Sequence, residues 1–234
     1  LEKLAKFGVR DRTIVVAAPA SLPSSLIYLA PFCAFSIAEY FRDRGHNVLL
    51  VLDELSAHAK YFRELSIIAR KMPGRDGYPG DVFHLHASLL ERAGRTMLSR
   101  GNESFQTLSL KIKGKTAAIT CLPVVDILGG DFTGYIATNL MAMTDGHIFF
   151  DIDLYQEGMR PAVNTTLSVT RVGRQTQTTV ERDFAREVRQ IMFEYAQAGE
   201  VAKFGVELLG TTQVKLLQGA KVYAILAQSN DVLI

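Results

Sequence analysis

The sequence is poor in cysteine and has no excess of charge of one sign. Its 234 residues include two cysteines, Cys33 and Cys121, which lie far apart and form no metal-ligand or redox spacing. A disulfide framework is therefore not expected. The 26 Lys and Arg residues against 24 Asp and Glu give a formal net charge of +2, which argues against a protein that coats a polyanion such as nucleic acid.

Long hydrophobic runs and targeting signals are also missing. The most apolar stretch, from Leu26 to Ala38, is about half of the roughly 20 residues that span a bilayer, and it contains Pro31. No transmembrane segment is predicted. Residues 1–12 carry charges and lack the apolar core and small-residue cleavage site of a signal peptide, so nothing in them predicts secretion.

Several motifs that would define a chemistry do not occur in these 234 residues. There is no GxxxxGK[ST] phosphate loop, whose backbone N–H groups cradle phosphates, and no Gly-x-Ser-x-Gly elbow for acyl transfer. His84 and His86 lie two residues apart in a helical pattern, so they point to different faces, and no carboxylate completes a metal set. The sequence therefore predicts neither a zinc site nor acyl-transfer chemistry.

What is present is the composition of an ordinary globular chain, 48% hydrophobic and 21% charged. Residues 13–18 and 48–52 have the continuous apolar pattern of strands buried on both faces. A helical pattern follows each of them, over 26–41, with Ser24 or Ser25 as its cap, and from Leu55 to Ile68. The alternation of strand and helix predicts a parallel α/β sheet.

The rest of the chain changes character near residue 175. A Gly- and Pro-rich loop, a helix, two strands around a Lys113-Gly114 turn, and a last strand are predicted in order over 72–81, 82–92, 105–125 and 162–170. Only helical patterns follow, over 180–207 and 211–227. We therefore predict an α/β domain over 1–174 and a helical domain over 175–234.

Asp53 is the most telling candidate for a functional residue. It follows the apolar run 48–52, so it lies at the carboxyl end of a parallel strand, where open α/β sheets bind ligands. In P-loop proteins an aspartate in this place holds Mg²⁺ opposite the phosphates. An acidic turn after a strand gives the same pattern without any ligand. The spacing alone does not distinguish a Mg²⁺-binding aspartate from such a turn.

Arg171 is the second candidate, because it follows the predicted strand 162–170, and Arg174 lies three residues later. A guanidinium at a strand end stabilises phosphate charge in its own site or in a neighbouring one. A surface arginine paired with a carboxylate is the alternative.

Long segments then give a more specific indication. The stretches TIVVAAPAS, YPGDVFHLHASLLER, GYIATNLMAMTDGHIFF and GMRPAVNTTLSVTRVGRQTQ, in this order, resemble the alpha subunit of F-type (proton-translocating) ATP synthases. The resemblance covers nearly the whole chain and begins after the family's phosphate loop. It implies a P-loop NTPase-type (RecA-like) parallel sheet, present in part, followed by part of an α-helical C-terminal domain. The segment 97–115 is longer than the corresponding turn of the family.

The resemblance also implies residue roles. Asp53 would face the Mg²⁺ ion, through water, and the ATP or ADP of a non-catalytic site, and Arg171 would be the arginine finger that reaches the catalytic site of the adjacent subunit. Arg160, Pro161 and Gln228 would line the adenine pocket. Asn230 replaces a second glutamine of the family, and Ala142 replaces a serine near the catalytic interface.

The partners and location come from the same resemblance. It implies a ring that alternates with the beta subunit around the gamma central stalk, with contacts to delta and the peripheral stalk. The complex would couple ATP synthesis to proton transport as a peripheral membrane assembly, on the cytoplasmic face of a bacterial inner membrane or the matrix side of an organelle membrane. The isolated chain is expected to be inactive.

Two other interpretations remain at this point. An ATP-independent interaction module would have kept the subunit surfaces without the phosphate loop. A relative from secretion or transcription-termination motors would share the nucleotide fold, although the YPGDVF and SVTRVG segments argue against it. No nucleic-acid partner is expected.

Overall fold

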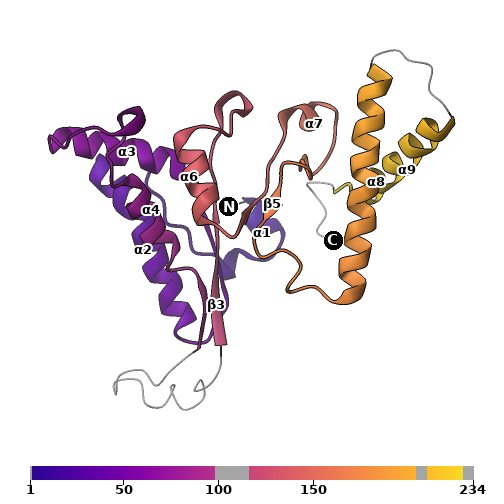
Figure 1. Cartoon of the computed structure of the whole chain (residues 1–234). Coiled ribbons are helices and arrows are strands. Elements are labelled where there is room, and N and C mark those ends of the chain that lie inside the picture. The colour runs from indigo at the N-terminus through magenta and orange to yellow at the C-terminus, as the bar shows by residue number, and fades with distance from the viewer. Residues whose placement is uncertain (1, 98–115, 204–209, 229–234) are drawn as a thin grey trace. The chain divides into compact units, whose positions relative to one another are not determined.

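The computed structural model describes residues 2–97, 116–203 and 210–228 (Figure 1). The chain forms two compact units, Leu1–Met143 and Thr144–Ile234. The predicted turn at Lys113-Gly114, the strand before it and the long segment 97–115 fall almost entirely outside the described residues.

The first unit holds most of the secondary structure. Its elements in chain order are α1 (Glu2–Lys6), η1 (Arg10–Arg12), α2 (Ser24–Arg42), β1 (Val48–Leu52), α3 (Leu55–Ile68), η2 (Arg75–Gly77), α4 (Val82–Leu90), β2 (Gly94–Met97), β3 (Thr116–Pro123), η4 (Leu128–Gly130) and α6 (Tyr135–Met143). The second unit contains β4 (Gly146–His147), α7 (Ile152–Gln156), β5 (Val169–Thr170), α8 (Thr179–Lys203) and α9 (Gly210–Leu226). The helices predicted over 26–41, 55–68, 82–92, 180–207 and 211–227 are thus confirmed within the described residues.

The sheet of the first unit has the strand order β1-β3-β2. Strands β1 and β3 are parallel, with Leu50 opposite Cys121 and Leu52 opposite Pro123. Strand β2 is antiparallel to β3, with Gly94 opposite Ile119. The parallel α/β pairing is therefore confirmed for β1 and β3, and β2 makes the sheet mixed.

The prediction of a buried strand over 13–18 is wrong. These residues form no strand, and Ile14 and Val15 are 58% and 56% exposed. A β-branched run becomes a strand only when a neighbouring strand accepts its backbone hydrogen bonds, and none of the described strands pairs with it. Strand β1 is also open on one face, because Leu49 and Val51 are exposed.

Helix α2 contributes its inner face to the core. It packs against β1, β3 and α3, and Phe35 and Ala38 are almost fully buried. By length and composition alone α2 could cross a membrane. Core helices can have the same length and composition, so we infer no membrane span. The predicted serine cap is wrong, since Pro23 occupies the N-cap position and no side chain caps the helix.

The core of the first unit joins α2, α3, α4 and α6 to the sheet. Its large, almost fully buried apolar side chains include Phe35 of α2, Leu55 of α3, Leu89 of α4 and Ile119 of β3. Each comes from a different element, so burial of this cluster fixes how α2, α3 and α4 lie on one face of the strands. This packing holds the carboxyl ends of β1 and β3 in place.

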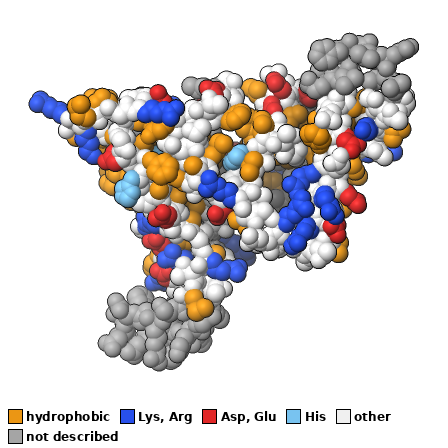
Figure 2. Space-filling model, in the orientation of Figure 1, with side chains coloured by type: hydrophobic (Ala, Val, Ile, Leu, Met, Phe, Trp, Pro, Cys, Tyr) orange, Lys and Arg blue, Asp and Glu red, His pale blue; other side chains and the backbone are white. Residues whose placement is uncertain are grey.

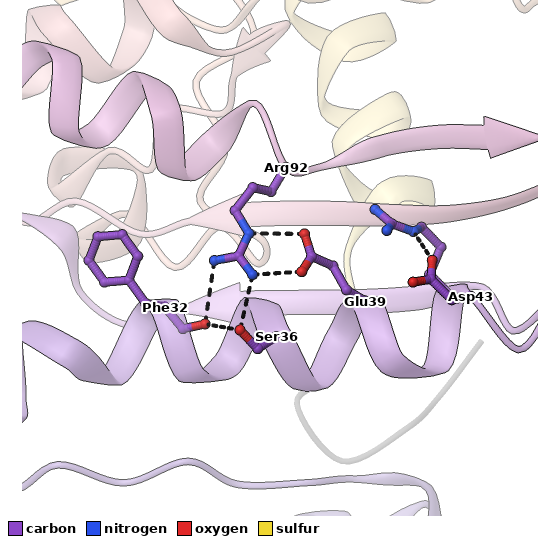
Figure 3. Close-up of polar contacts among 6 residues, drawn as sticks. Phe32, Ser36, Glu39, Asp43 and Arg92 are labelled. Atoms are coloured by element: carbon purple, nitrogen blue, oxygen red, sulfur yellow. Dashed lines mark hydrogen bonds and ion pairs between the residues drawn. The ribbon is translucent and has the colours of Figure 1, made fainter. Parts of the chain in front are cut away.

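A bidentate ion pair joins the chain after α4 to α2 (Figure 3). Arg92 donates from Nε to Glu39 Oε1 at 2.9 Å and from Nη2 to Glu39 Oε2 at 2.6 Å. Nη2 also donates to the Ser36 hydroxyl at 3.1 Å. Both charged side chains are only about a quarter exposed, at 26% and 27%. The hydrogen bond from Arg92 lowers the pKa of Glu39 below its usual value.

We expect Arg92→Lys to lower the free energy of unfolding by about 1 to 2 kcal/mol, because lysine keeps the charge but loses the planar fork. Arg75→Lys is the matched control, since Arg75 and its partner Asp76 are 72% and 60% exposed and such pairs contribute little. Urea unfolding at neutral pH measures both. Equal midpoints for the two variants would show that the fork of Arg92 adds nothing.

In the second unit the predicted strand 162–170 is shorter than expected. Only Val169 and Thr170 form β5, which pairs with β4, and one isolated bridge joins Phe150 and Val163. Asn164 causes the break, because its Oδ1 accepts the backbone N–H groups of Thr166 and Leu167 and holds a turn.

Helices α8 and α9 form an extensive contact. The rings of Tyr195 and Tyr223 lie 5.2 Å apart between them, and Gly219 leaves the room that the Tyr195 side chain occupies. The two compact units separate between Met143 and Thr144, whereas the helices-only region starts at Thr179. The domain boundary near 175 stays a prediction.

Candidate nucleotide site

Asp53 lies where the sequence places it, directly after the last residue of β1, and its side chain is exposed. Because β1 and β3 are parallel, their carboxyl ends share one edge of the sheet. The chain that leaves β3 therefore runs beside Asp53. This edge is the ligand-binding edge of an open α/β sheet.

Hydrogen bonds join the carboxyl ends of β1 and β3. The N–H of Val124 donates to Leu52 O at 2.9 Å, and the N–H of Leu55 donates to Val124 O at 2.9 Å. Glu54 completes the link, because its Oε2 accepts from the N–H of Asp126 at 3.0 Å and from the Ser56 hydroxyl at 2.6 Å. The backbone that carries Asp53 is thus fixed on both sides.

These hydrogen bonds determine which of the two carboxylates after β1, Asp53 or Glu54, is available to a metal. The Glu54 oxygen Oε2 is occupied by Ser56 and Asp126, while Asp53 is exposed at the edge. Among the described residues no group of three or more His, Cys, Asp or Glu side chains could hold a metal. Mg²⁺ keeps several waters and needs only one or two protein carboxylates beside the phosphates of its nucleotide. A single Asp53 carboxylate fits Mg²⁺ and does not fit zinc.

Three other predicted site residues meet in the second unit. The backbone N–H of Gln228 donates to Arg160 O at 2.8 Å, which places Gln228 beside the Arg160-Pro161 pair. The Arg160 guanidinium lies 3.6 Å from the centre of the Tyr155 ring, and Nη1 donates to the carbonyls of Tyr155 and Met159. Arg160 is thus fixed in place by its own turn. No local spacing indicates its neighbour Gln228, 68 residues later, which the family resemblance alone placed near the same base.

Arg171 follows β5 and is exposed. Its backbone N–H donates to Asp145 O at 2.7 Å, so the chain at Arg171 is held against the start of β4. Gly146 makes this approach possible, because a Cβ at that position would lie 2.5 Å from Val169 O. The guanidinium is therefore carried on a short, tightly paired strand end.

The predicted site residues are divided between the two units. Asp53 belongs to the first unit, and Arg160, Pro161, Arg171 and Gln228 belong to the second. Ala142 lies on α6 with its side chain exposed, and Asn230 is outside the described residues. Cys121 is a poor nucleophile, since burial raises the pKa of its thiol to about 11.

Sequence reasoning missed two polar features of the first unit. The strand ending predicts nothing about Glu54, whose partner Asp126 is 72 residues away. The spacing of His84 and His86 does not indicate the partner of His86, whose Nε2 lies 3.1 Å from Nδ1 of His58 in the fold. The available signal is the helical spacing, because His58 and His86 each lie three or four residues from apolar residues on the buried face of their helix.

A parallel strand pair with an exposed aspartate at its carboxyl edge, covered by helices, is typical of nucleotide-binding α/β proteins. Residues 1–170 match the ATP synthase alpha/beta family, nucleotide-binding domain. The chain belongs to this family, and the P-loop NTPase fold class predicted from the sequence is confirmed.

Curated relatives agree with this assignment. The chain is 42% identical over 230 residues to ATP synthase subunit alpha of Haemophilus influenzae (strain PittEE). It is 39% identical to ATP synthase subunit alpha of Alcanivorax borkumensis and 40% identical to that of Colwellia psychrerythraea. Each match covers 97% of this chain and 44% of the relative. The chain therefore spans less than half the length of these relatives.

Proposed function

We propose that this chain acts as a nucleotide-binding, non-catalytic alpha-type subunit of an F-type ATP synthase. The proposal rests on one observation: Asp53 is exposed at the carboxyl ends of the parallel strands β1 and β3, in a chain of the ATP synthase alpha/beta family. In this role the subunit binds Mg-ATP without hydrolysing it and supplies a residue to a neighbouring catalytic site. ATP formation coupled to proton transport is the activity of the whole complex.

Asp53 is the residue proposed for Mg²⁺. The bound ion would neutralise charge on the nucleotide phosphates, and Asp53 would orient it through its carboxylate, directly or through water. Glu54 and Asp126 would keep the strand end in position, since their hydrogen bond fixes the backbone on either side of Asp53.

The adenine end of the nucleotide is proposed to lie against Arg160, Pro161 and Gln228. The backbone bond from Gln228 to Arg160 supports this placement, because it brings Gln228 to the turn after α7. The ring of Pro161 offers an apolar surface, and the Gln228 side-chain amide can both donate and accept hydrogen bonds with a base.

Arg171 is proposed as the arginine finger of the neighbouring beta subunit's catalytic site. Partners would be the beta subunit in an alternating ring, the gamma central stalk and the delta or peripheral stalk. The membrane would be reached only through the proton channel sector of the complex. The isolated chain is expected to show no ATPase activity, because the 234 residues contain no phosphate-loop lysine or glycine cradle.

The test uses the complete alpha subunit that carries this chain, assembled with beta and gamma. Asp53→Asn should lower Mg²⁺-dependent retention of ATP at the non-catalytic sites by about tenfold or more, because it removes the exposed carboxylate that directly follows β1. Asp43→Asn, an exposed aspartate at the end of α2, is the matched control.

Two outcomes would contradict the proposal. Equal ATP retention by the Asp53→Asn and Asp43→Asn rings would remove the Mg²⁺ role from Asp53. Assembly with beta and gamma while no nucleotide is retained by the parent subunit would favour the ATP-independent interaction module.

A further inference from the structure

The second unit also contains a basic hollow. Its volume is about 300 Å³. The turn at Thr165 and Thr166, the loop at Arg174 and one face of α8 form its walls. Figure 2 shows basic side chains gathered on this part of the surface. None of Arg160, Pro161, Arg171 and Gln228 lines it.

The lining is strongly positive. Three of its seven residues are arginines, Arg174, Arg186 and Arg189, and none of the seven is acidic. Two carboxylates contact the lining: Asp183 Oδ1 lies 2.6 Å from Nη2 of Arg186, and Glu194 Oε1 accepts from Gln190 Nε2 at 2.6 Å. Glu194 also pairs with Lys215 at 3.4 Å, so the three guanidinium groups still leave an excess of positive charge beside the hollow.

The walls are held in place by the chain itself. Arg186, Arg189, Gln190 and Phe193 have the spacing that places them on one face of α8. The opposite wall is fixed by Asn164, whose Oδ1 accepts the N–H of Thr166 at 3.0 Å. Arg182 anchors the loop between them, since its Nη2 donates to the carbonyls of Arg174 and Gln177.

We propose that this hollow is a second anion site, which binds the phosphate groups of a small soluble compound such as a diphosphate. Planar guanidinium forks match phosphate oxygens in pairs, and the threonine hydroxyls supply further donors. The volume is at the lower end for small-molecule sites, which suits one or two phosphate groups. The side chain of Phe193 adds an apolar contact for an attached group.

The test titrates the full chain with inorganic pyrophosphate by calorimetry at low ionic strength. EDTA is present, so that a Mg²⁺-dependent nucleotide site contributes nothing. The double variant Arg186→Gln with Arg189→Gln should weaken binding by about tenfold or more. The control, Arg10→Gln with Arg12→Gln, removes the same charge from the exposed η1 of the first unit and should change the affinity by less than about twofold.

A second variant tests the hollow without any change in α8. Arg174→Gln alters the hollow from the loop and leaves α8 intact, and it should also weaken pyrophosphate binding. Equal affinity of the parent, the hollow variants and the control would overturn the proposal. Retention on phosphatidic acid vesicles without any binding of pyrophosphate would also overturn it, because the ligand would then be a lipid headgroup.

Discussion

Replacing Arg171 with lysine in the complete ATP synthase should lower ATP turnover by about 10³-fold to 10⁵-fold, the range typical of arginine fingers. Lysine keeps the positive charge but loses the planar fork that contacts two phosphate oxygens at once. The expected loss appears in steady-state hydrolysis and synthesis, while assembly of the ring stays intact. This prediction rests on the proposed role of Arg171 in the neighbouring catalytic site.

The structure indicates why the substitution should leave the fold unchanged. Arg171 is exposed, and its backbone N–H donates to Asp145 O at 2.7 Å, a bond that does not depend on the side chain. A lysine at 171 would keep this bond. Loss of turnover together with normal assembly would therefore report on the side chain alone.

Arg12→Lys is the control for this experiment, since Arg12 is an exposed residue of η1 with no proposed role in the site. Its turnover should stay within about twofold of the parent. If Arg171→Lys and Arg12→Lys turn over ATP at the same rate, Arg171 does not act as an arginine finger.

Helices of this chain could be predicted because their signal is local. The apolar spacing of α3 and α4 is complete within each segment, and both helices lie in the structure as expected. Strands depend on partners that the local pattern does not contain. Residues 13–18 carry a strong β pattern and form no strand, and Asn164 cuts the predicted last strand to two residues through a turn.

The candidate site likewise has one feature that the sequence predicts and others that it does not. Asp53 could be placed from the sequence, because an aspartate directly after a buried parallel strand must lie at its carboxyl edge. The bond from Asp126 to Glu54 spans 72 residues, and the bond from Gln228 to Arg160 joins two ends of the second unit. Such contacts follow from tertiary packing, so no spacing within one segment predicts them.

The buried pair His58 and His86 should make the first unit sensitive to mild acid. His58 Nε2 lies 3.0 Å from Tyr28 O, and His58 Nδ1 lies 3.1 Å from His86 Nε2. Because a carbonyl only accepts, neutral His58 donates from Nε2 and accepts at Nδ1 from His86. The rings of Tyr28 and Phe32 pack on His58. The pair is therefore satisfied when both rings are neutral.

Burial lowers the pKa of both histidines, and the neighbouring His58 helps to lower that of His86 to about 4. The unfolded chain, with an ordinary pKa near 6.5, binds a proton first as the pH falls. Stability is therefore complete above about pH 6.5 and is lost progressively down to about pH 4. For His86 alone the loss is about 2 kcal/mol at pH 5 and about 3 kcal/mol at pH 4.

Urea unfolding of the first unit between pH 7 and pH 5 measures this effect. The double variant His58→Gln with His86→Gln should lose less stability over this range than the parent, whatever its stability at pH 7. His84→Gln is the matched control, since His84 lies on the same helix but is exposed, and it should follow the parent. Glu39 does not interfere, because its lowered pKa places its own loss of stability below about pH 4.5. Parallel curves for the parent and the double variant would show that the buried pair does not titrate with unfolding.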